Sequence, residues 1–339
     1  MDIPIDLGGL NLGDLNLGEL SAAADEKKPD PSQLHDILIL GGGPASMTAA
    51  VYCARKMMKV AVITEDFGGQ MGETTEIENY MGFMMIGGKE LVGKFLEHMK
   101  KFEVAAAQHE RVTRVEKDGE TFTAHTDGGA VYKGKTVICA LGKRYKHLNI
   151  PGEKELAGRG VSYCEICDAP FFHNRRVVVA GGGNSAFTAA FDLMKIAASV
   201  TVVNHSPGWK ADKIMFEQVK AGANVTLIDN HDFEKIEGER KVTAVVIKDN
   251  SSGEQKTIET DGVFVEIGGM PNSEPVAELV QLNEFNEIAI DCHCHTSVEG
   301  FFAAGDVTTV PYKQIVVSAG EGSKAALAAY DYLASAGKL

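Results

Sequence analysis

Short apolar runs that end in glycine dominate the hydrophobic pattern of the chain from residue 34 onward. Residues 37–40 (ILIL) lead into the glycine-rich segment 41–46 (GGGPAS), and a helical pattern then continues to Lys56. A second apolar run follows at 60–63. Continuous runs of this kind, bounded by glycine, are typical of strands buried on both faces of a parallel sheet. The pattern predicts strand, helix and strand, which is how a Rossmann-like unit begins.

The same pattern returns 140 positions further along the chain, without a gap. Residues 177–180 (VVVA) lead into 181–186 (GGGNSA), a helical pattern follows, and 200–203 form the closing apolar run. Two glycine turns, each between a predicted strand and a predicted helix, are far more specific than one. The duplication predicts two Rossmann-like units and two dinucleotides, a flavin and a pyridine nucleotide.

The glycine turns carry the binding chemistry. Glycine lets the chain turn tightly and brings bare N–H groups against a pyrophosphate, where the positive end of the helix dipole favours negative charge. The residues predicted to bind the two dinucleotides at these turns are Gly41, Gly43, Pro44, Ala45 and Ser46 in the first unit, and Gly181, Gly183, Asn184, Ser185 and Ala186 in the second.

Two junctions rich in glycine and proline, 148–152 and 268–272, frame the second unit. We therefore expect an α/β fold of two Rossmann-like, three-layer domains, one inserted into the other. Residues 34–148 and 272–339 would form the FAD-binding domain, and 149–271 the pyridine-nucleotide-like domain. Because both crossings fall at turn-prone residues, a hinge is expected there.

An N-terminal extension precedes these domains. Residues 7–21 repeat a pentad of leucine and glycine, and each glycine weakens a helix by about 1 kcal/mol. We expect 1–33 to be a flexible extension, with docking of a leucine strip on a partner or on its own domain as the alternative.

Composition narrows the range of partners and locations. The formal net charge of −14 disfavours nucleic acid, whose phosphates would be repelled. No apolar run reaches the ~20 residues that cross a bilayer, and no secretory signal is visible. Six cysteines in 339 residues do not resemble a disulfide framework. We expect a cytoplasmic protein that binds neither nucleic acid nor membrane.

A cysteine pair just before the second unit indicates redox chemistry. Cys164 and Cys167 are separated by two residues, which puts both sulfurs on one helical turn, close enough to bridge. A cysteine at a helix N-terminus has a stabilised thiolate, as disulfide exchange requires. The neighbouring Asp168 adds a carboxyl group that can hold or donate a proton.

A second dense cluster, residues 292–295 (CHCH), supports a competing interpretation. Together with Cys164 and Cys167 it could make a four-ligand zinc site, and the protein would then be a zinc-stapled FAD-binding protein without disulfide turnover. However, Cys292 and Cys294 fall at alternate positions of a predicted strand. We expect independent thiols or core packing there, and no metal site.

From residue 34 onward the chain resembles the low-molecular-weight thioredoxin reductase family. The motifs that carry the resemblance occur in the family's order: GGGPAS at 41–46, GGQ at 68–70, TTEIENY at 74–80, ALG at 140–142, PGE at 151–153, CEICD at 164–168, GGGNSA at 181–186, AGD at 304–306 and YKQ at 312–314. Their joint occurrence is highly specific.

The resemblance implies FAD as a cofactor, bound by the first unit. Thr64 or Glu65 would lie near the adenosine ribose, and Asp306 beside the ribityl chain or pyrophosphate. A helix that begins near Lys313 and Gln314 would aim its N-terminus at the flavin and favour its anionic reduced form. The remaining residues assigned to the FAD site are Gly69, Gln70, Asn79, Ala140, Gly142, Gly305 and Ile315.

The resemblance also implies the roles of the redox residues. Cys167 would lie beside the flavin, Cys164 would attack the disulfide of a partner, and Asp168 would protonate the leaving thiolate. Because one pair cannot reach both places at once, the pyridine-nucleotide domain would rotate at the two junctions. The family associates through its FAD domains, so we expect a homodimer.

Three segments resemble the flavoprotein subunit of alkyl hydroperoxide reductase more closely than they resemble thioredoxin reductases. They are residues 309–314, 320–322 and 209–212. That subunit carries an additional thioredoxin-like region with its own cysteine pair, whereas the first 34 residues here contain no cysteine. We therefore expect a separate thioredoxin- or glutaredoxin-like protein as the acceptor. Service of a peroxiredoxin system through a separate carrier is an alternative.

The second nucleotide site departs from the family. Relatives that use NADPH carry arginines after the closing strand, which pair with the 2′-phosphate, whereas this chain has His205 and Ser206 there. Relatives that use NADH carry a glutamate, which is Asn204 here. The sequence favours NADH over NADPH, through Asn204 and His205, and leaves ferredoxin or a deazaflavin open as the electron donor.

Overall fold

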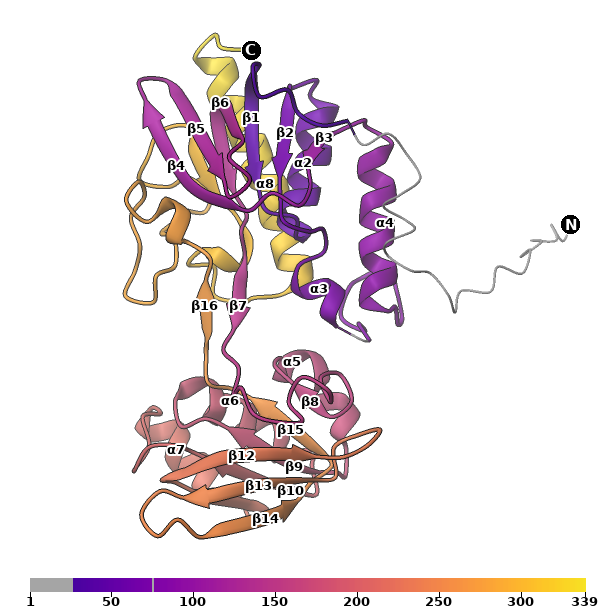
Figure 1. Cartoon of the computed structure of the whole chain (residues 1–339), viewed down its shortest axis with the longest axis vertical. Helices are drawn as coiled ribbons and strands as arrows, with labels where there is room; N and C mark the ends of the chain where they lie inside the picture. The colour runs from indigo at the N-terminus through magenta and orange to yellow at the C-terminus, as the bar shows by residue number, and fades with distance from the viewer. Residues whose placement is uncertain (1–26, 75) are drawn as a thin grey trace, which may run out of the picture.

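A computed structural model describes residues 27–74 and 76–339. It shows two lobes joined by two neighbouring strands (Figure 1). The leucine-rich pentads of the predicted N-terminal extension lie outside the described residues.

The first lobe is built on a seven-stranded sheet in the order β3-β2-β1-β6-β5-β4, with β17 also pairing with β6. The strands are β1 (Leu34–Leu40), β2 (Val60–Ile63), β3 (Ala105–Ala107), β4 (Val112–Asp118), β5 (Thr121–Thr126), β6 (Val131–Cys139) and β17 (Phe301–Ala303). β1 runs parallel to β2 and β6, and β17 runs parallel to β6. The carboxyl ends of these strands therefore meet at one edge of the sheet, where ligands of α/β proteins bind.

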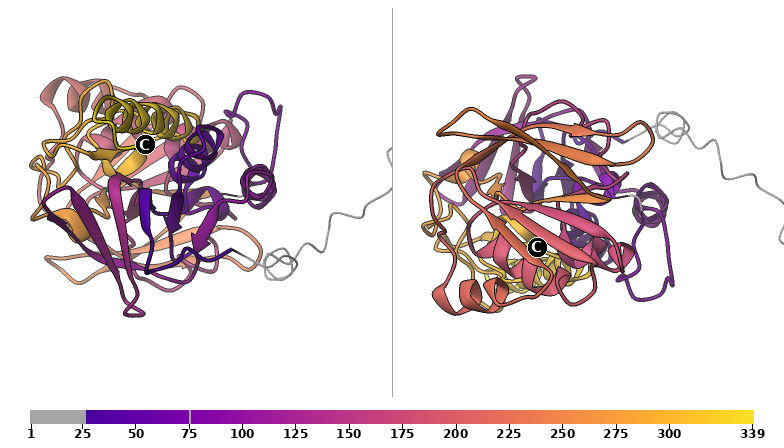
Figure 2. Two further views of the ribbon diagram at one scale, coloured as in Figure 1. Left: turned by 90° about the horizontal axis from the view of Figure 1, so that it is seen from above. Right: turned by 90° about the horizontal axis from the view of Figure 1, so that it is seen from below.

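Helices cover one face of this sheet. They are α2 (Pro44–Arg55), α3 (Gln70–Glu73), α4 (Gly88–Lys100) and α8 (Ile315–Ser335). The short 3-10 turns η3 (Glu274–Val276) and η4 (Gly305–Val307) contribute Val276 and Val307 to the core cluster on the opposite face. Figure 2 shows α2 and α8 side by side on the sheet. Gly322 makes this close packing possible, because a Cβ there would lie 2.1 Å from the carbonyl oxygen of Ala45.

The apolar run in β1 is buried on both faces, as its sequence predicts. Ile37 and Ile39 belong to the core cluster under the helices, whereas Leu38 and Leu40 belong to the cluster on the opposite face. All four side chains are fully buried. Alternation of side chains across a strand produces this division, and a hydrophobic layer on each face of the sheet follows from it.

The second lobe contains a parallel five-stranded sheet in the order β11-β10-β9-β15-β8, and a three-stranded antiparallel sheet in the order β12-β13-β14. The strands are β8 (Val161–Ser162), β9 (Arg176–Ala180), β10 (Ser199–Val203), β11 (Val225–Ile228), β12 (His231–Glu237), β13 (Ala244–Asp249), β14 (Gln255–Glu259) and β15 (Gly262–Val265). The helices are α5 (Glu165–Asp168), η2 (Ala169–Phe172), α6 (Asn184–Leu193) and α7 (Lys213–Lys220).

The internal duplication is confirmed element by element. β1, α2 and β2 have their counterparts in β9, α6 and β10. The close approach at the turn is also repeated. A Cβ on Gly41 would lie 2.3 Å from the carbonyl oxygen of Ala140, and one on Gly181 would lie 2.4 Å from that of Glu266. Both glycines have positive φ, which explains why the turn requires them.

The two crossings between the lobes lie next to each other. β7 (Lys143–Tyr145) pairs antiparallel with β16 (Gly269–Pro271), and Figure 1 shows the two strands spanning from one lobe to the other. The second lobe is one continuous stretch of chain, whereas the first combines segments before and after it. The predicted fold, with one Rossmann-like unit inserted into another, is confirmed. The residue boundaries of the two ligand-binding domains stay predictions.

None of the helices in the described ranges combines the length and the apolar character needed to cross a membrane.

Candidate functional site

The first glycine turn leaves open space at the start of a helix. Gly43 is the N-cap residue of α2, and no side chain in the described part of the chain caps this helix end. A Cβ on Gly43 would meet no atom of residues 27–74 and 76–339 within 4 Å. Since the first N–H groups of a helix have no partner within it, α2 offers donors and positive charge to an anion beside this space. The turn therefore fits the pyrophosphate of a dinucleotide.

Two of the predicted residues, Ser46 and Thr64, form hydrogen bonds to backbone carbonyls at or beside this turn. The Ser46 hydroxyl donates to the Gly41 carbonyl, and the Thr64 hydroxyl donates to the Asp66 carbonyl. Ser46 and Thr64 are both buried, whereas Glu65 is exposed. Of the two alternatives for the adenosine ribose, Glu65 is thus the one with a carboxylate available to accept from hydroxyl groups.

The N-terminus of α8 is another part of the predicted FAD site. Gln314 is its N-cap residue and Ile315 its first residue, and none of the side chains that the structure describes caps it. The Asn79 amide donates to Gln314 Oε1 at 3.1 Å, which brings the loop after α3 to this helix end. The Lys313 ammonium is held by the Glu287 carboxylate at 2.9 Å. Lys313 therefore anchors the start of α8, and the helix end itself carries the positive potential.

Asp306 lies between α8 and the link to the second lobe. Ser318 donates to Asp306 Oδ1 at 3.1 Å, and the Lys143 ammonium lies 4.0 Å from Asp306 Oδ2. Burial raises the pKa of Asp306, and Lys143 opposes that rise. Gln70 donates to the Lys143 carbonyl at 2.6 Å. The structure therefore brings Gln70, Asp306 and Lys143 together.

Lys143 was not predicted from the sequence. It follows the Ala-Leu-Gly segment directly and begins the first crossing strand. Burial lowers its pKa, whereas the carboxylates of Asp306 and Glu266 raise it. Its position beside a predicted glycine is the only sequence signal that could have identified it. The glycines around it, Gly69, Gly142 and Gly305, all have positive φ, and a Cβ on Gly305 would lie 3.1 Å from the Ala45 Cβ.

The cysteine pair is a disulfide. Cys164 and Cys167 are bonded, with Cα atoms 5.3 Å apart, and Cys164 is the N-cap residue of α5. Both side chains are partly exposed. The Cys164 N–H donates to Ser162 Oγ at 3.2 Å, and the Asp168 N–H donates to the Cys164 carbonyl at 3.1 Å. The predicted helical turn around the pair is confirmed.

Three acidic groups near the disulfide have raised pKa values. Burial raises the pKa of Asp168, the pKa of Glu165 to about 7 and the pKa of Glu266 to about 8. Asp192 raises the Glu165 value further and Lys195 lowers it. Perturbed carboxyl groups of this kind are typical of sites that move protons. Glu165 and Glu266 were not singled out from the sequence, although Glu165 stands between the two cysteines.

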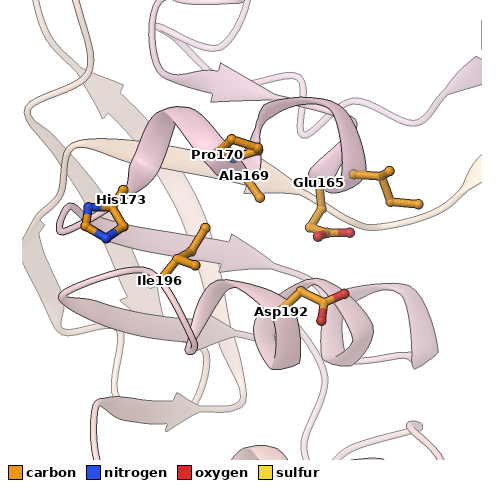
Figure 3. A pocket seen from close by; sticks show the side chains of 7 residues that line it. Glu165, Ala169, Pro170, His173, Asp192 and Ile196 are labelled. Carbon is orange, nitrogen blue, oxygen red and sulfur yellow. The ribbon is translucent and has the colours of Figure 1, made fainter. Parts of the chain in front are cut away.

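A concave surface lies beside α5, lined by the side chains shown in Figure 3. The Glu165 and Asp192 carboxyl groups point toward each other from α5 and α6, with His173 at the other end. The other side of the redox segment faces the first lobe. Burial raises the pKa of Asp168, and Glu76 adds to that rise; burial and then Glu153 raise the pKa of Tyr163, and Glu73 adds to that rise. The disulfide therefore lies near the α3 end of the first lobe, and Figure 1 shows α5 below α3.

The second glycine turn repeats the geometry of the first. Gly183 is the N-cap residue of α6. Among the described residues, no side chain caps this helix end and no atom lies within 4 Å of a Cβ placed on Gly183. Ala186 is buried beneath the turn, whereas Ser185 is exposed. The Asn184 side chain accepts from the Asp212 N–H at 2.7 Å. This turn fits a second pyrophosphate for the same physical reasons as the first.

Asn204, at the end of β10, corresponds to Thr64 in the first unit. Its side-chain N–H₂ donates to the carbonyls of Ser206 at 2.8 Å and Gly208 at 2.6 Å. Its Oδ1 remains an acceptor next to the glycine turn. His205 follows and is largely exposed, in contact with Asp232.

The zinc interpretation is wrong for the residues that the structure describes. Cys164 and Cys167 are in a disulfide, and no group of three or more metal-ligating side chains lies together in 27–74 and 76–339. Cys294 is buried against Glu321 of α8, with Sγ 3.3 Å from Oε2. Cys292 is exposed.

The predicted strand through 292–294 is also wrong. The Asp291 side chain accepts from the N–H groups of His293 at 2.8 Å and His295 at 2.9 Å, and Cys294 has φ +67°. The aspartate thus holds a turn that alternating apolar positions cannot reveal.

Comparison with known proteins agrees with this geometry. A family model described as pyridine nucleotide-disulphide oxidoreductase matches residues 35–322. An NADH dehydrogenase of Bacillus subtilis is 42% identical over 298 residues, which cover 88% of this chain and 58% of that protein. One subunit of an alkyl hydroperoxide reductase, from Staphylococcus aureus, is 40% identical over 312 residues, which cover 92% and 62%. The chain thus spans about three fifths of the length of these curated relatives.

A solved structure has the same fold. The crystal structure of thioredoxin reductase from Streptococcus pyogenes superposes with a TM-score of 0.85 at 38% identity, covering 89% of this chain and 99% of that one.

Proposed function

Because the chain belongs to the pyridine nucleotide-disulphide oxidoreductase family, we propose that it reduces the disulfide of a small thioredoxin-like protein through FAD and the Cys164–Cys167 disulfide. Family members use FAD and NAD(P)H. The observation that carries the proposal is a partly exposed disulfide at the start of α5, in a chain with two glycine turns that each fit a pyrophosphate. NADH is the proposed electron donor.

The first lobe would hold FAD and the second the pyridine nucleotide, with the domain boundaries predicted from the sequence. Bound FAD supplies the chemistry that turns a hydride into a pair of electrons for a disulfide. The starts of α2 and α8 would orient FAD. Glu65 would lie at its adenosine ribose, and Asp306 beside its ribityl chain or pyrophosphate. Lys143, 4.0 Å from Asp306, would partly balance the charge there.

The exchange step uses the chain's own sulfurs. After reduction of the pair, the Cys164 thiolate attacks the partner's disulfide, a mixed disulfide forms and one partner thiolate leaves. Asp168, whose pKa is raised by burial, donates a proton to a leaving thiolate. The Cys167 thiol then gives up its proton and attacks Cys164, and the second partner sulfur leaves and takes up that proton. Two electrons and two protons pass to the partner, and the Cys164–Cys167 disulfide is restored.

The proposal includes the other features predicted from the sequence. Four of the six cysteines are free, which is usual for a reducing compartment and supports a cytoplasmic location. Rotation of the second lobe about β7 and β16 would carry the disulfide between flavin and partner. Homodimer formation through the first lobe completes the proposal.

A second candidate is electron supply to a peroxiredoxin through a separate carrier. The similarity to one subunit of an alkyl hydroperoxide reductase, over 92% of this chain, favours it. In that case a carrier with its own cysteine pair would be the immediate acceptor, and the same Cys164 chemistry would apply.

The test is an anaerobic titration of the purified FAD-loaded protein with NADH and, separately, with NADPH, while the visible flavin absorbance is followed. We expect rapid bleaching by NADH. Absence of bleaching by either nucleotide, with the flavin still reducible by dithionite, would contradict the proposed donor and point to ferredoxin or a deazaflavin.

A coupled assay then tests the acceptor. The NADH-reduced protein should reduce a thioredoxin disulfide, and Cys164→Ser should lower that rate by more than about 10³-fold while flavin reduction by NADH changes little. Cys292→Ser is the matched control, because Cys292 is an exposed thiol outside the proposed path. A Cys164→Ser variant that still turns over thioredoxin would contradict the proposed role of the pair.

A further inference from the structure

The loop after β10 folds onto the second glycine turn. The Lys210 N–H donates to the Gly182 carbonyl at 2.8 Å, and the Asp212 N–H donates to Asn184 Oδ1 at 2.7 Å. In a Rossmann unit the end of this strand contacts the adenosine ribose, and the residues that follow surround its 2′ position. Residues 204–212 therefore line the place where NADH and NADPH differ.

Carboxylates from another element of the fold face this loop. Asp232, in β12, contacts His205 Nδ1 through its Oδ1. Asp229, just before β12, accepts from the Gly208 N–H through its Oδ2 at 2.7 Å. Asn250 fixes the same loop from a third position, since its amide donates to the His205 carbonyl at 3.1 Å. Two negative side chains are thus held against the residues that would meet a 2′-phosphate.

These carboxylates also change what His205 can do. A protonated His205 could attract a phosphate, but its ring nitrogen is in contact with Asp232 and its charge would be balanced there. Lys210, the other basic side chain of the loop, is exposed. A ribose hydroxyl carries no charge and can donate to Asn204 Oδ1, whereas a 2′-phosphate would meet like charge.

We infer that Asp232, supported by Asp229, is the specificity determinant that rejects the 2′-phosphate and makes the second lobe selective for NADH. This inference rests on the proposed function, because it assumes that the second glycine turn binds a pyridine nucleotide. The selecting charge comes from β12, far along the chain from the glutamate position at the end of β10. For this reason residues 204–210 alone could not reveal it.

The chain offers a direct reporter of binding. Trp209 is the single tryptophan and lies in this loop, with its ring 5.2 Å from the ring of Phe187 between centroids. Titration of the FAD-loaded protein with 5′-AMP and with 2′,5′-ADP, followed by Trp209 fluorescence and by calorimetry, measures the cost of the 2′-phosphate without any turnover. We expect 5′-AMP to bind about tenfold more tightly than 2′,5′-ADP.

Variants locate the source of this preference. Asp232→Asn should tighten binding of 2′,5′-ADP by about fivefold and leave 5′-AMP unchanged. His205→Arg added to Asp232→Asn should reverse the preference, because an unpaired guanidinium can then bind the phosphate. Glu237→Gln is the matched control. It removes one negative charge from the same strand, where Glu237 pairs with Lys235 at 3.2 Å.

The outcomes separate the inference from the proposed function. An unchanged ratio in Asp232→Asn, or an equal shift in Glu237→Gln, overturns the inference, and so does failure of both compounds to bind by either method. Selective binding of 5′-AMP in a protein whose flavin is not bleached by NADH would support the site and contradict the proposed donor.

Discussion

The ring of Tyr145 stacks on the ring of Tyr163, with the centroids 5.5 Å apart and the planes 20° apart. Tyr145 ends the crossing strand β7, whereas Tyr163 directly precedes Cys164. The stack therefore connects the link between the lobes to the redox segment. Burial raises the pKa of both phenols, and the Tyr145 value is raised further by Asp306 of the first lobe and Glu266 of the second.

Removal of this ring should weaken the junction. Tyr145→Ala is expected to lower the free energy of unfolding by about 1–3 kcal/mol, because it deletes the stacked and partly buried aromatic surface. Tyr145→Phe keeps the ring and should lose less than half as much. Urea unfolding followed by circular dichroism, at saturating FAD, measures both. Tyr312→Ala is the control, since Tyr312 is 68% exposed, and an equal loss in that variant would argue against a role for the stack.

Alanine at two glycines of the first lobe should change different properties: FAD affinity at Gly43 and protein stability at Gly322. Gly43→Ala adds a methyl group to open space at a φ of −77°, so the stability of the apoprotein should change by less than about 1 kcal/mol. The same methyl group would stand where the pyrophosphate approaches, and FAD affinity should fall by about 100-fold or more. Fluorescence titration of the apoprotein with FAD checks the affinity.

Gly322→Ala tests the packing of α2 against α8 instead. Its new Cβ would lie 2.1 Å from the Ala45 carbonyl oxygen, so the helices must separate and the stability should fall by about 2 kcal/mol or more.

Gly183→Ala is the counterpart of Gly43→Ala in the second lobe and should leave FAD binding intact. If Gly43→Ala bound FAD as tightly as the unmodified protein, the first turn would not be the pyrophosphate site.

The cysteines should titrate in a fixed pattern. Cys292 is the exposed one of the four free thiols, whereas Cys53, Cys139 and Cys294 are buried with pKa values raised to about 12. The native oxidised protein should therefore show one fast-reacting thiol with Ellman's reagent, and two more after reduction of Cys164–Cys167. Cys292→Ser should remove the first one. A chelator should leave the counts unchanged, and a count that rose with chelator would revive a metal site.

The glycine turns and the redox pair could be predicted from the sequence because they depend on local chemistry. Gly41 and Gly181 need positive φ at a fixed distance after a buried strand, and Cys164 and Cys167 need one helical turn. Such requirements leave a contiguous pattern in the chain.

The missed features depend on contacts between distant segments. Lys143 meets Asp306 across 163 positions, and Asp232 meets His205 from a different sheet. The strand predicted at 292–294 failed for a related reason. A single side chain, Asp291, provides hydrogen bonds that outweigh the alternation of apolar and polar residues.

The stability of the redox segment should depend on pH through Glu165. Burial raises the pKa of its carboxyl group from an ordinary value of 4.5 to about 7. The folded state therefore holds this proton more tightly than the unfolded state does. The stabilising contribution is complete below pH 4.5 and is lost as the pH rises through 7, because a charged carboxylate must then remain buried beside Asp192.

Glu165→Gln removes this ionisation and keeps the shape of the side chain. We expect the variant to be more stable than the unmodified protein above pH 7, by on the order of 1–3 kcal/mol, and the difference to vanish toward acidic pH. Urea midpoints measured from about pH 5 to pH 8.5 test this. Glu217→Gln, at an exposed position on α7, should show no such divergence. Parallel curves for Glu165→Gln and the unmodified protein would mean that this carboxyl group is solvated and that its proton plays no part at the disulfide.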